Sequence, residues 1–101
     1  MSWNELNKQV VKWAKDRDIF YGSTPQAQLL KAMSEMGELA DAEIKGDAVG
    51  RMDAVGDVLV CLIIYCKFYE MDAEFCLSQA YEEIKNRKGK MVEGGAFVKD
   101  E

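Results

Sequence analysis

The chain contains no histidine, and only one proline and three cysteines occur in its 101 residues. Without histidine, covalent catalysis by a Ser–His or Cys–His arrangement is excluded. Zinc would depend on cysteine and carboxylate ligands, and the cysteine spacings match no familiar zinc motif. Three cysteines cannot all pair with one another, so we expect Cys61, Cys66 and Cys76 to be reduced thiols in the core. Neither a zinc site nor a disulfide framework is expected.

Long apolar runs and an excess of basic charge are also absent. The run 58–66 has nine apolar residues, too few to span a bilayer, and the N-terminal segment lacks the apolar centre of a signal peptide. The formal net charge of -5 argues against long nucleic acid as a partner. We therefore expect a cytoplasmic protein that binds neither membranes nor long nucleic acid.

Capping signals and apolar spacing predict a single domain, 1–101, with four helices. The helices cover about 3–18, 25–45, 48–70 and 73–87, with a loop over 19–24 and glycine stops at Gly46 and Gly89. The tail, 90–101, is expected to form a hairpin or an extended arm around two adjacent glycines. The predicted fold is all-α, a four-helix bundle-like arrangement with short connections.

The predicted third helix is the most apolar segment of the chain. A helix that is apolar around most of its circumference is expected to be central. A unit of four helices rarely covers every such face alone, so we expect this helix also to face a second subunit. The apolar positions are Val55, Val58, Leu59, Val60, Leu62, Ile63 and Ile64.

Two pairs of carboxylates occur at helical spacing, Glu35 with Glu38 and Asp53 with Asp57. Residues three or four apart share one helix face, about 40 to 60° apart around the axis. If the two helices pack face to face, up to four anionic groups converge, and protons or a divalent cation must neutralise them. The spacing therefore indicates a hard-metal site, and the alternative is an ordinary solvated acidic face.

Two glycines stand beside these carboxylates in mid-helix. Gly37 lies between the glutamates, and Gly56 immediately precedes Asp57. A glycine in a helix interior costs about 1 kcal/mol relative to alanine. That cost suggests either close helix packing or room for a ligand.

Asp57 opens the most apolar run, where an unpaired carboxylate is expensive to bury. A salt bridge to Arg51 or Lys45 would stabilise it, as would a metal ion. Oxygen-only ligands favour magnesium or manganese. Because bound magnesium commonly shares phosphate oxygens, a nucleotide phosphate is the expected substrate class.

The segment 85–90 is basic, with Lys85, Arg87 and Lys88 near the end of the fourth helix. These side chains either oppose the helix dipole or bind a polyphosphate. No glycine-rich loop ending in lysine and serine or threonine is present, which excludes a P-loop.

The second helix carries a polar ridge in which Gln28 and Lys31 precede Glu35 on successive turns. Each is either an exposed helix residue or a ligand contact, Lys31 to phosphate and Gln28 to a base. Trp13 is a further candidate for stacking on a base, although tryptophan at helical spacing is more often a core or interface residue.

Three segments in succession resemble the MazG-like all-α nucleoside triphosphate pyrophosphohydrolases of the small phage and bacterial type. They are AQLLKAMSEMGELADA, DAVGDVLVCLIIY and AYEEIKNRKGKM, which with their connections cover most of the chain from about Pro25. The resemblance implies a MazG-type fold and a homodimer or homotetramer with its site near a subunit contact. It also implies magnesium-dependent hydrolysis between the α and β phosphates, giving a nucleoside monophosphate and pyrophosphate, in clearance of surplus or noncanonical nucleotides.

The family pattern directs a glutamate pair on one helix, and a glutamate and an aspartate on the next, at magnesium. Glu35, Glu38 and Asp57 fall on three of these positions. The fourth is Ala54, and the expected substitute is Asp53, one residue earlier. Glu35 or Glu38 would orient or deprotonate the attacking water. The expected phosphate contacts are Lys31, Lys85, Arg87 and Lys88.

Two other functions stay open at this point. One is a non-catalytic helical module for binding a partner, in which the loss of glutamate at Ala54 has removed activity. The other is the phosphoribosyl-ATP pyrophosphohydrolase branch of the same superfamily.

Overall fold

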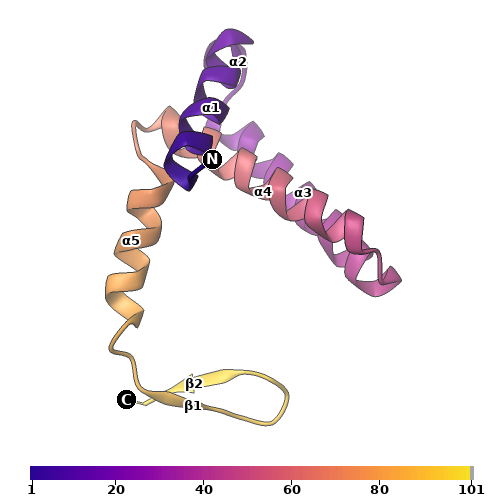
Figure 1. The fold of residues 1–101 in the computed structure, drawn as a ribbon, viewed down its shortest axis with the longest axis vertical. Coiled ribbons are helices and arrows are strands. Elements are labelled where there is room, and N and C mark those ends of the chain that lie inside the picture. The colour runs from indigo at the N-terminus through magenta and orange to yellow at the C-terminus, as the bar shows by residue number, and fades with distance from the viewer. Residues whose placement is uncertain (101) are drawn as a thin grey trace.

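The computed structural model describes residues 1–100, which form five helices followed by a small antiparallel hairpin (Figure 1). The predominantly helical fold is therefore as predicted. The elements are α1 (Trp3–Asp16), α2 (Ile19–Gly22), α3 (Pro25–Lys45), α4 (Ala48–Phe68), α5 (Ala73–Ile84), β1 (Gly89–Met91) and β2 (Phe97–Lys99). None of these helices is long and apolar enough to cross a membrane.

Side-chain caps fix where the four longer helices begin. Each capping oxygen accepts a hydrogen bond from a backbone N–H of the first turn, which would otherwise lack a partner. Gly46, with φ of 68°, ends α3 in the left-handed conformation that glycine adopts at little cost. The caps are Ser2, Thr24, Asp47 and Asp72, at donor–acceptor distances of 2.8 to 3.1 Å.

The chain between α1 and α3 differs from the prediction of a helix to Asp18 and a loop over 19–24. Helix α1 ends at Asp16, and Ile19–Gly22 form the short helix α2. Asp18 has φ of 57°, in the left-handed region that aspartate tolerates better than most residues, and there it breaks the helix. Ser23 then caps the end of α2 immediately before α3.

The end of α5 also differs from the prediction. The helix stops at Ile84 rather than near Arg87, although the Arg87 N–H still donates to the Ile84 carbonyl (2.9 Å). Gly89, expected to end the helix, instead opens β1 and pairs with Lys99. A Cβ at Gly89 would collide with the backbone of Val98, so a side chain there is excluded by the partner strand.

The tail adopts the hairpin form of the two predicted alternatives. Lys90 pairs with Val98, and Met91 pairs with Phe97. Gly94 and Gly95, with φ of 97° and 89°, supply the turn conformations that other residues rarely adopt.

Most of the core lies where α1 crosses the hairpin of α3 and α4 (Figure 1), and Ala42 and Ala54 extend it toward the turn between those two helices. It is built from small and medium side chains, and no large one is fully buried. All three cysteines are free thiols, but Cys76 is exposed, so the prediction of a core thiol is wrong there. The buried apolar residues are Val11, Ala14, Ala32, Ala42, Ala54, Cys61, Ile63, Ile64 and Cys66.

A single chain is more open than a four-helix bundle. Helix α5 contacts the end of α4 and then leads away from α3 and α4, carrying the hairpin with it (Figure 1). The radius of gyration is 16.3 Å, against about 13 Å for a compact domain of this length.

The expected central helix α4 is covered on one side only. Four apolar side chains spaced three or four residues apart, which we call the α4 stripe, are 37 to 68% exposed. Such spacing places them on one helix face. One molecule therefore leaves a continuous apolar face of α4 open. The stripe consists of Met52, Val55, Leu59 and Leu62.

Candidate functional site

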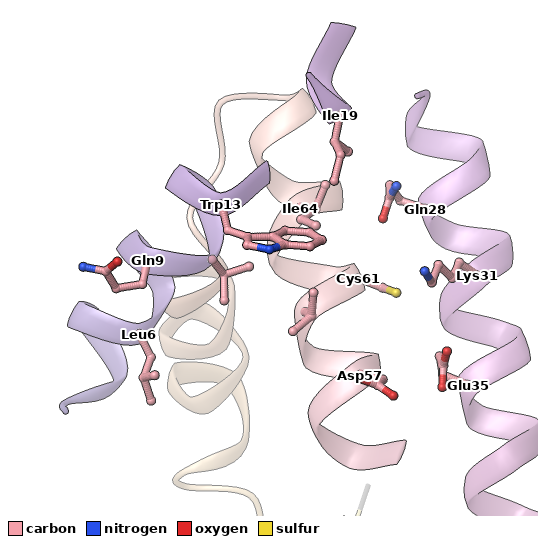
Figure 2. A pocket seen from close by; sticks show the side chains of 12 residues that line it. Leu6, Gln9, Trp13, Ile19, Gln28, Lys31, Glu35, Asp57, Cys61 and Ile64 are labelled. Atoms are coloured by element: carbon pink, nitrogen blue, oxygen red, sulfur yellow. The ribbon is translucent and has the colours of Figure 1, made fainter. Parts of the chain in front are cut away.

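A hollow of about 520 Å³ lies between α1, α3 and α4 (Figure 2). We call it the apolar hollow, because most of its wall is aliphatic or aromatic, with polar groups concentrated on α3. A volume of this size suits a small organic ligand such as a nucleotide. Its lining residues are Leu6, Gln9, Val10, Trp13, Ile19, Gln28, Lys31, Glu35, Asp57, Val60, Cys61 and Ile64.

The polar groups of α3 follow one another along the apolar hollow. Gln28, Lys31 and Glu35 are three and four residues apart, so they share one face of the helix. Figure 2 shows them in this order along α3, with Asp57 of α4 opposite Glu35. The predicted polar ridge thus lines the hollow, with an amide at one end and carboxylates at the other.

Glu35 is the electrostatic centre of the site. A hydrogen bond with Glu38, which requires a proton on one of the two carboxyls, is the largest cause that raises the pKa of Glu35. Partial burial and the negative charges of Glu38 and Asp57 raise the pKa further, whereas the Lys31 ammonium opposes the shift. With both carboxyls ionised, Oε2 of Glu35 is buried without a hydrogen-bond partner. Glu35 is therefore suited to hold a proton or to ligate a cation.

A second hollow of about 400 Å³, the acidic hollow, lies beside the first at the turn between α3 and α4. Asp57 lines both hollows, while Glu38 and Asp53 line only this one. The four carboxylates predicted as metal ligands are thus distributed over two adjoining depressions. The acidic hollow is lined by Glu38, Asp41, Ala42, Lys45, Asp47, Gly50, Asp53, Ala54 and Asp57.

Within residues 1–100, no three of the acidic or cysteine side chains are already arranged as a metal cage. The donors nevertheless fit a hard divalent cation, because they are all oxygens and one of them, Oε2 of Glu35, is buried without a partner. Ala54 is only 3% exposed and offers no oxygen ligand, whereas its neighbour Asp53 brings a carboxylate to the acidic hollow.

Asp57 does not form the salt bridge that was the alternative to a metal ion. Arg51 pairs instead with Glu43, at 3.2 Å between Nη1 and Oε1. Lys45 lines the acidic hollow with Asp57, but no ion pair joins them in the described chain. The charge of Asp57 is therefore balanced by none of the cations that the sequence suggested.

Of the four predicted phosphate contacts, only Lys31 lies at the carboxylates. Lys85 pairs with Glu82 at 2.6 Å, while Arg87 and Lys88 line a separate depression with Lys99 of the hairpin. Figure 1 shows that α5 leads this basic segment away from α3 and α4. Within one chain, the structure does not bring it to the two hollows.

Trp13 and Gln28, the two candidates for binding a base, both line the apolar hollow. Arg17 lies over the Trp13 ring, 4.6 Å from its centroid, and so braces the indole. The sequence did not single out Gln9, Cys61 or the aliphatic wall. The apolar wall residues had only a periodicity that any packed helix shares, and Gln9 had no signal of its own.

The mid-helix glycines have no close neighbour within one chain. A Cβ at Gly37 or Gly56 would meet nothing within 4 Å. The interpretation that these glycines allow close helix packing therefore finds no support inside a single molecule.

Comparison with known proteins gives one distant relative. The chain is 36% identical over 69 residues to an "Uncharacterized 18.2 kDa protein in rep-hol intergenic region" of Haemophilus phage HP1. The aligned part covers 68% of this chain but only 42% of the phage protein. No protein-family model matches the chain. No solved structure matches it significantly.

Proposed function

We propose that the protein is a magnesium-dependent nucleoside triphosphate pyrophosphohydrolase of the MazG-like kind. The observation that carries the proposal is the position of Glu35, which faces other carboxylates and also lines a hollow of nucleotide size. The reaction is attack of water between the α and β phosphates, with release of a nucleoside monophosphate and pyrophosphate.

The two ends of the apolar hollow suit the two ends of a nucleotide. The carboxylates and Lys31 are the charged end, where phosphates bridged by a cation would lie. Trp13 and the aliphatic side chains form the other end, where a base would stack or pack. Gln28 and Glu35 are seven positions apart on α3, about 10 Å along the axis at 1.5 Å per residue, a length suited to a nucleoside and its first phosphate.

Glu35, Glu38 and Asp57 are the residues that would hold magnesium, or manganese, with Asp53 in the place of the family glutamate. A cation bound there would neutralise charge that develops on the phosphate oxygens. Glu35 or Glu38 accepts a proton from the attacking water, and the raised pKa of Glu35 favours such a role. Lys31 orients the phosphates as a point charge.

The active form in this proposal is a homodimer or homotetramer. In one chain the α4 stripe is exposed and α5 leads away from α3 and α4. The helices of a single chain therefore do not form a closed bundle. A second copy covering the α4 stripe would complete a MazG-type bundle. Lys85, Arg87 and Lys88 would then contact phosphates in the site of a neighbouring copy, because α5 carries them away from their own.

A non-catalytic partner-binding module is the second candidate. The observation that favours it is the absence of a ready-made metal cage among residues 1–100, together with Ala54 at the fourth position. A phosphoribosyl-ATP pyrophosphohydrolase is an alternative within the same chemistry, and a substrate panel separates it from the first proposal.

One experiment tests these functions together. The purified protein is incubated with magnesium and a panel of ribo- and deoxynucleoside triphosphates plus phosphoribosyl-ATP, and pyrophosphate and monophosphate are measured. We expect turnover of triphosphates that EDTA abolishes. If no substrate is cleaved and magnesium does not raise the melting temperature, the enzyme proposal fails and the binding module is favoured.

A further inference from the structure

The Gln28 side chain is held in a fixed orientation at the end of the apolar hollow. Its Nε2 donates a hydrogen bond to Oγ of Ser23, at 3.1 Å. Ser23 is itself held at the end of α2, where its backbone N–H donates to the Ile19 carbonyl. Both side chains are half-buried. The bond uses one of the two N–H donors of the amide and restricts rotation of the amide plane.

The oxygen of this amide, Oε1 of Gln28, is left to accept a hydrogen bond in the hollow. Gln28 lines it, and Figure 2 shows the amide directed from α3 toward Cys61 and Ile64 of α4. No described side chain or backbone N–H donates to Gln28 Oε1. The hollow wall that it faces is largely apolar, so a ligand placed there finds few other groups with which to form hydrogen bonds.

We propose that Gln28, oriented by Ser23, selects nucleotides whose base carries an amine at C4 of a pyrimidine or at C6 of a purine, cytosine or adenine, over uracil and thymine. The inference rests on the proposed function in one respect, that the hollow holds the base of a nucleotide. The amine N–H donates to Gln28 Oε1, and Trp13 lies beside the base. Gln28 is thus a specificity-determining residue, and Ser23 is its positioning residue.

Uracil is rejected for a physical reason. If its 4-oxo group takes the place of the amine, two oxygen acceptors face each other without a donor between them. If uracil instead presents its N3–H, the carbonyl oxygens on either side meet apolar wall and lose their hydrogen bonds to water. An unpaired buried polar group of this kind reduces binding by about 10- to 100-fold.

The test measures binding of CMP, AMP and UMP by calorimetry in EDTA, so that neither metal nor turnover is involved. We expect CMP and AMP to bind the native protein at least about tenfold more tightly than UMP. Ser23→Ala frees the amide to turn, so the preference should shrink as CMP weakens and UMP changes little. Gln28→Ala should abolish the preference, and the double variant should be no worse than Gln28→Ala.

Two further variants separate a specific contact from a structural effect. Gln28→Glu keeps an acceptor at the same place and should retain the preference for CMP. Gln26→Ala removes an exposed amide two residues earlier on α3 and should leave every affinity unchanged. Circular dichroism checks that each variant is folded.

Equal binding of CMP and UMP overturns the inference, because the amide would then not discriminate between the bases. Tighter binding of UMP also overturns it, because the amide would then present Nε2 to the hollow. Absence of binding by every monophosphate overturns it as well. Hydrolysis of triphosphates without base preference removes this inference and leaves the proposed function standing. A preference for CMP over UMP in the binding assay, without hydrolysis of any triphosphate, leaves this inference standing and removes the proposed function.

Discussion

Glu35 of α3 and Asp57 of α4 line one hollow from opposite sides, and the charge of Asp57 helps to raise the pKa of Glu35. Asp57 also lines the acidic hollow, where Glu38 and Asp53 lie. Through Asp57, the charges in the two depressions therefore influence one another. A cation or a proton bound at either carboxylate changes the charge that the other experiences.

The metal-free protein should lose stability as the pH rises. A carboxyl whose pKa is raised in the folded state binds more protons folded than unfolded, so stability falls between its ordinary pKa, about 4.5, and the raised value. Glu35→Gln removes the repulsion and should melt at a higher temperature than the native protein at pH 7.5. That gain should shrink as the pH falls toward 4.5. The measurement is thermal unfolding followed by circular dichroism in EDTA.

Glu43→Gln is the matched control for this prediction, since Glu43 lies on the same helix but pairs with Arg51. It should give no gain in melting temperature at pH 7.5. A gain of equal size in both variants would mean that the general acidity of α3 is responsible, rather than the cluster around Glu35.

Removing a single carboxylate should abolish most of the turnover without unfolding the chain. We expect Glu38→Gln and Asp57→Asn each to lower kcat by about a hundredfold, the usual contribution of a positioned acid–base or charge-stabilising group. Steady-state release of pyrophosphate measures the effect, with Glu43→Gln as the control that keeps its activity. If Asp57→Asn turned over normally, the proposed site would have to lie elsewhere.

Asp53→Asn tests whether Asp53 replaces the glutamate that the MazG-like proteins, which the sequence resembles, have at the position of Ala54. Because Asp53 lines the acidic hollow with Glu38 and Asp57, its loss should raise the magnesium concentration needed for half-maximal activity by about tenfold. A magnesium titration of the rate measures this shift. An unchanged titration curve would limit the ligands to Glu35, Glu38 and Asp57.

Local sequence signals predicted the beginnings of the longer helices. Capping signals placed the starts of these helices, and Thr24, Asp47 and Asp72 supply the caps in the structure, because capping is a contact within one turn. The spacing of Gln28, Lys31 and Glu35 likewise predicted a shared face. Each of these predictions depends on residues fewer than eight positions apart.

The features that the sequence did not predict depend on backbone conformations and contacts between helices that no short residue pattern specifies. The short helix α2 needs the left-handed Asp18, a conformation that several residue types adopt and that no single letter specifies. Arg51 and Asp57 are six residues apart on α4 and so lie on different faces of that helix, and the placement of α3 against α4 brings Arg51 to Glu43 instead. The direction of α5 depends on Glu70, at φ of 56°, in the turn that follows α4.

The α4 stripe should be covered by a second copy in solution. Leu59 and Leu62 are more than a third exposed in one chain, so Leu59→Lys and Leu62→Lys should cause little harm to a true monomer. In the proposed oligomer each would bury a charge, so we expect a lower mass by size-exclusion chromatography with light scattering and a lower melting temperature. Tyr21→Lys, at a side chain 94% exposed on α2, is the control and should change neither.

The mid-helix glycines give the oligomer a second, independent test. Within one chain a Cβ at Gly56 meets nothing within 4 Å, so alanine there should stabilise a monomer by about 0.5–1 kcal/mol. Gly56 lies one turn from both Met52 and Leu59, however, and a second helix packed on the α4 stripe would leave no room for the added methyl group. We therefore expect Gly56→Ala to weaken association by about tenfold, measured as the concentration dependence of the oligomer mass. A melting temperature that rises equally at all protein concentrations would mean that no second copy packs against this glycine.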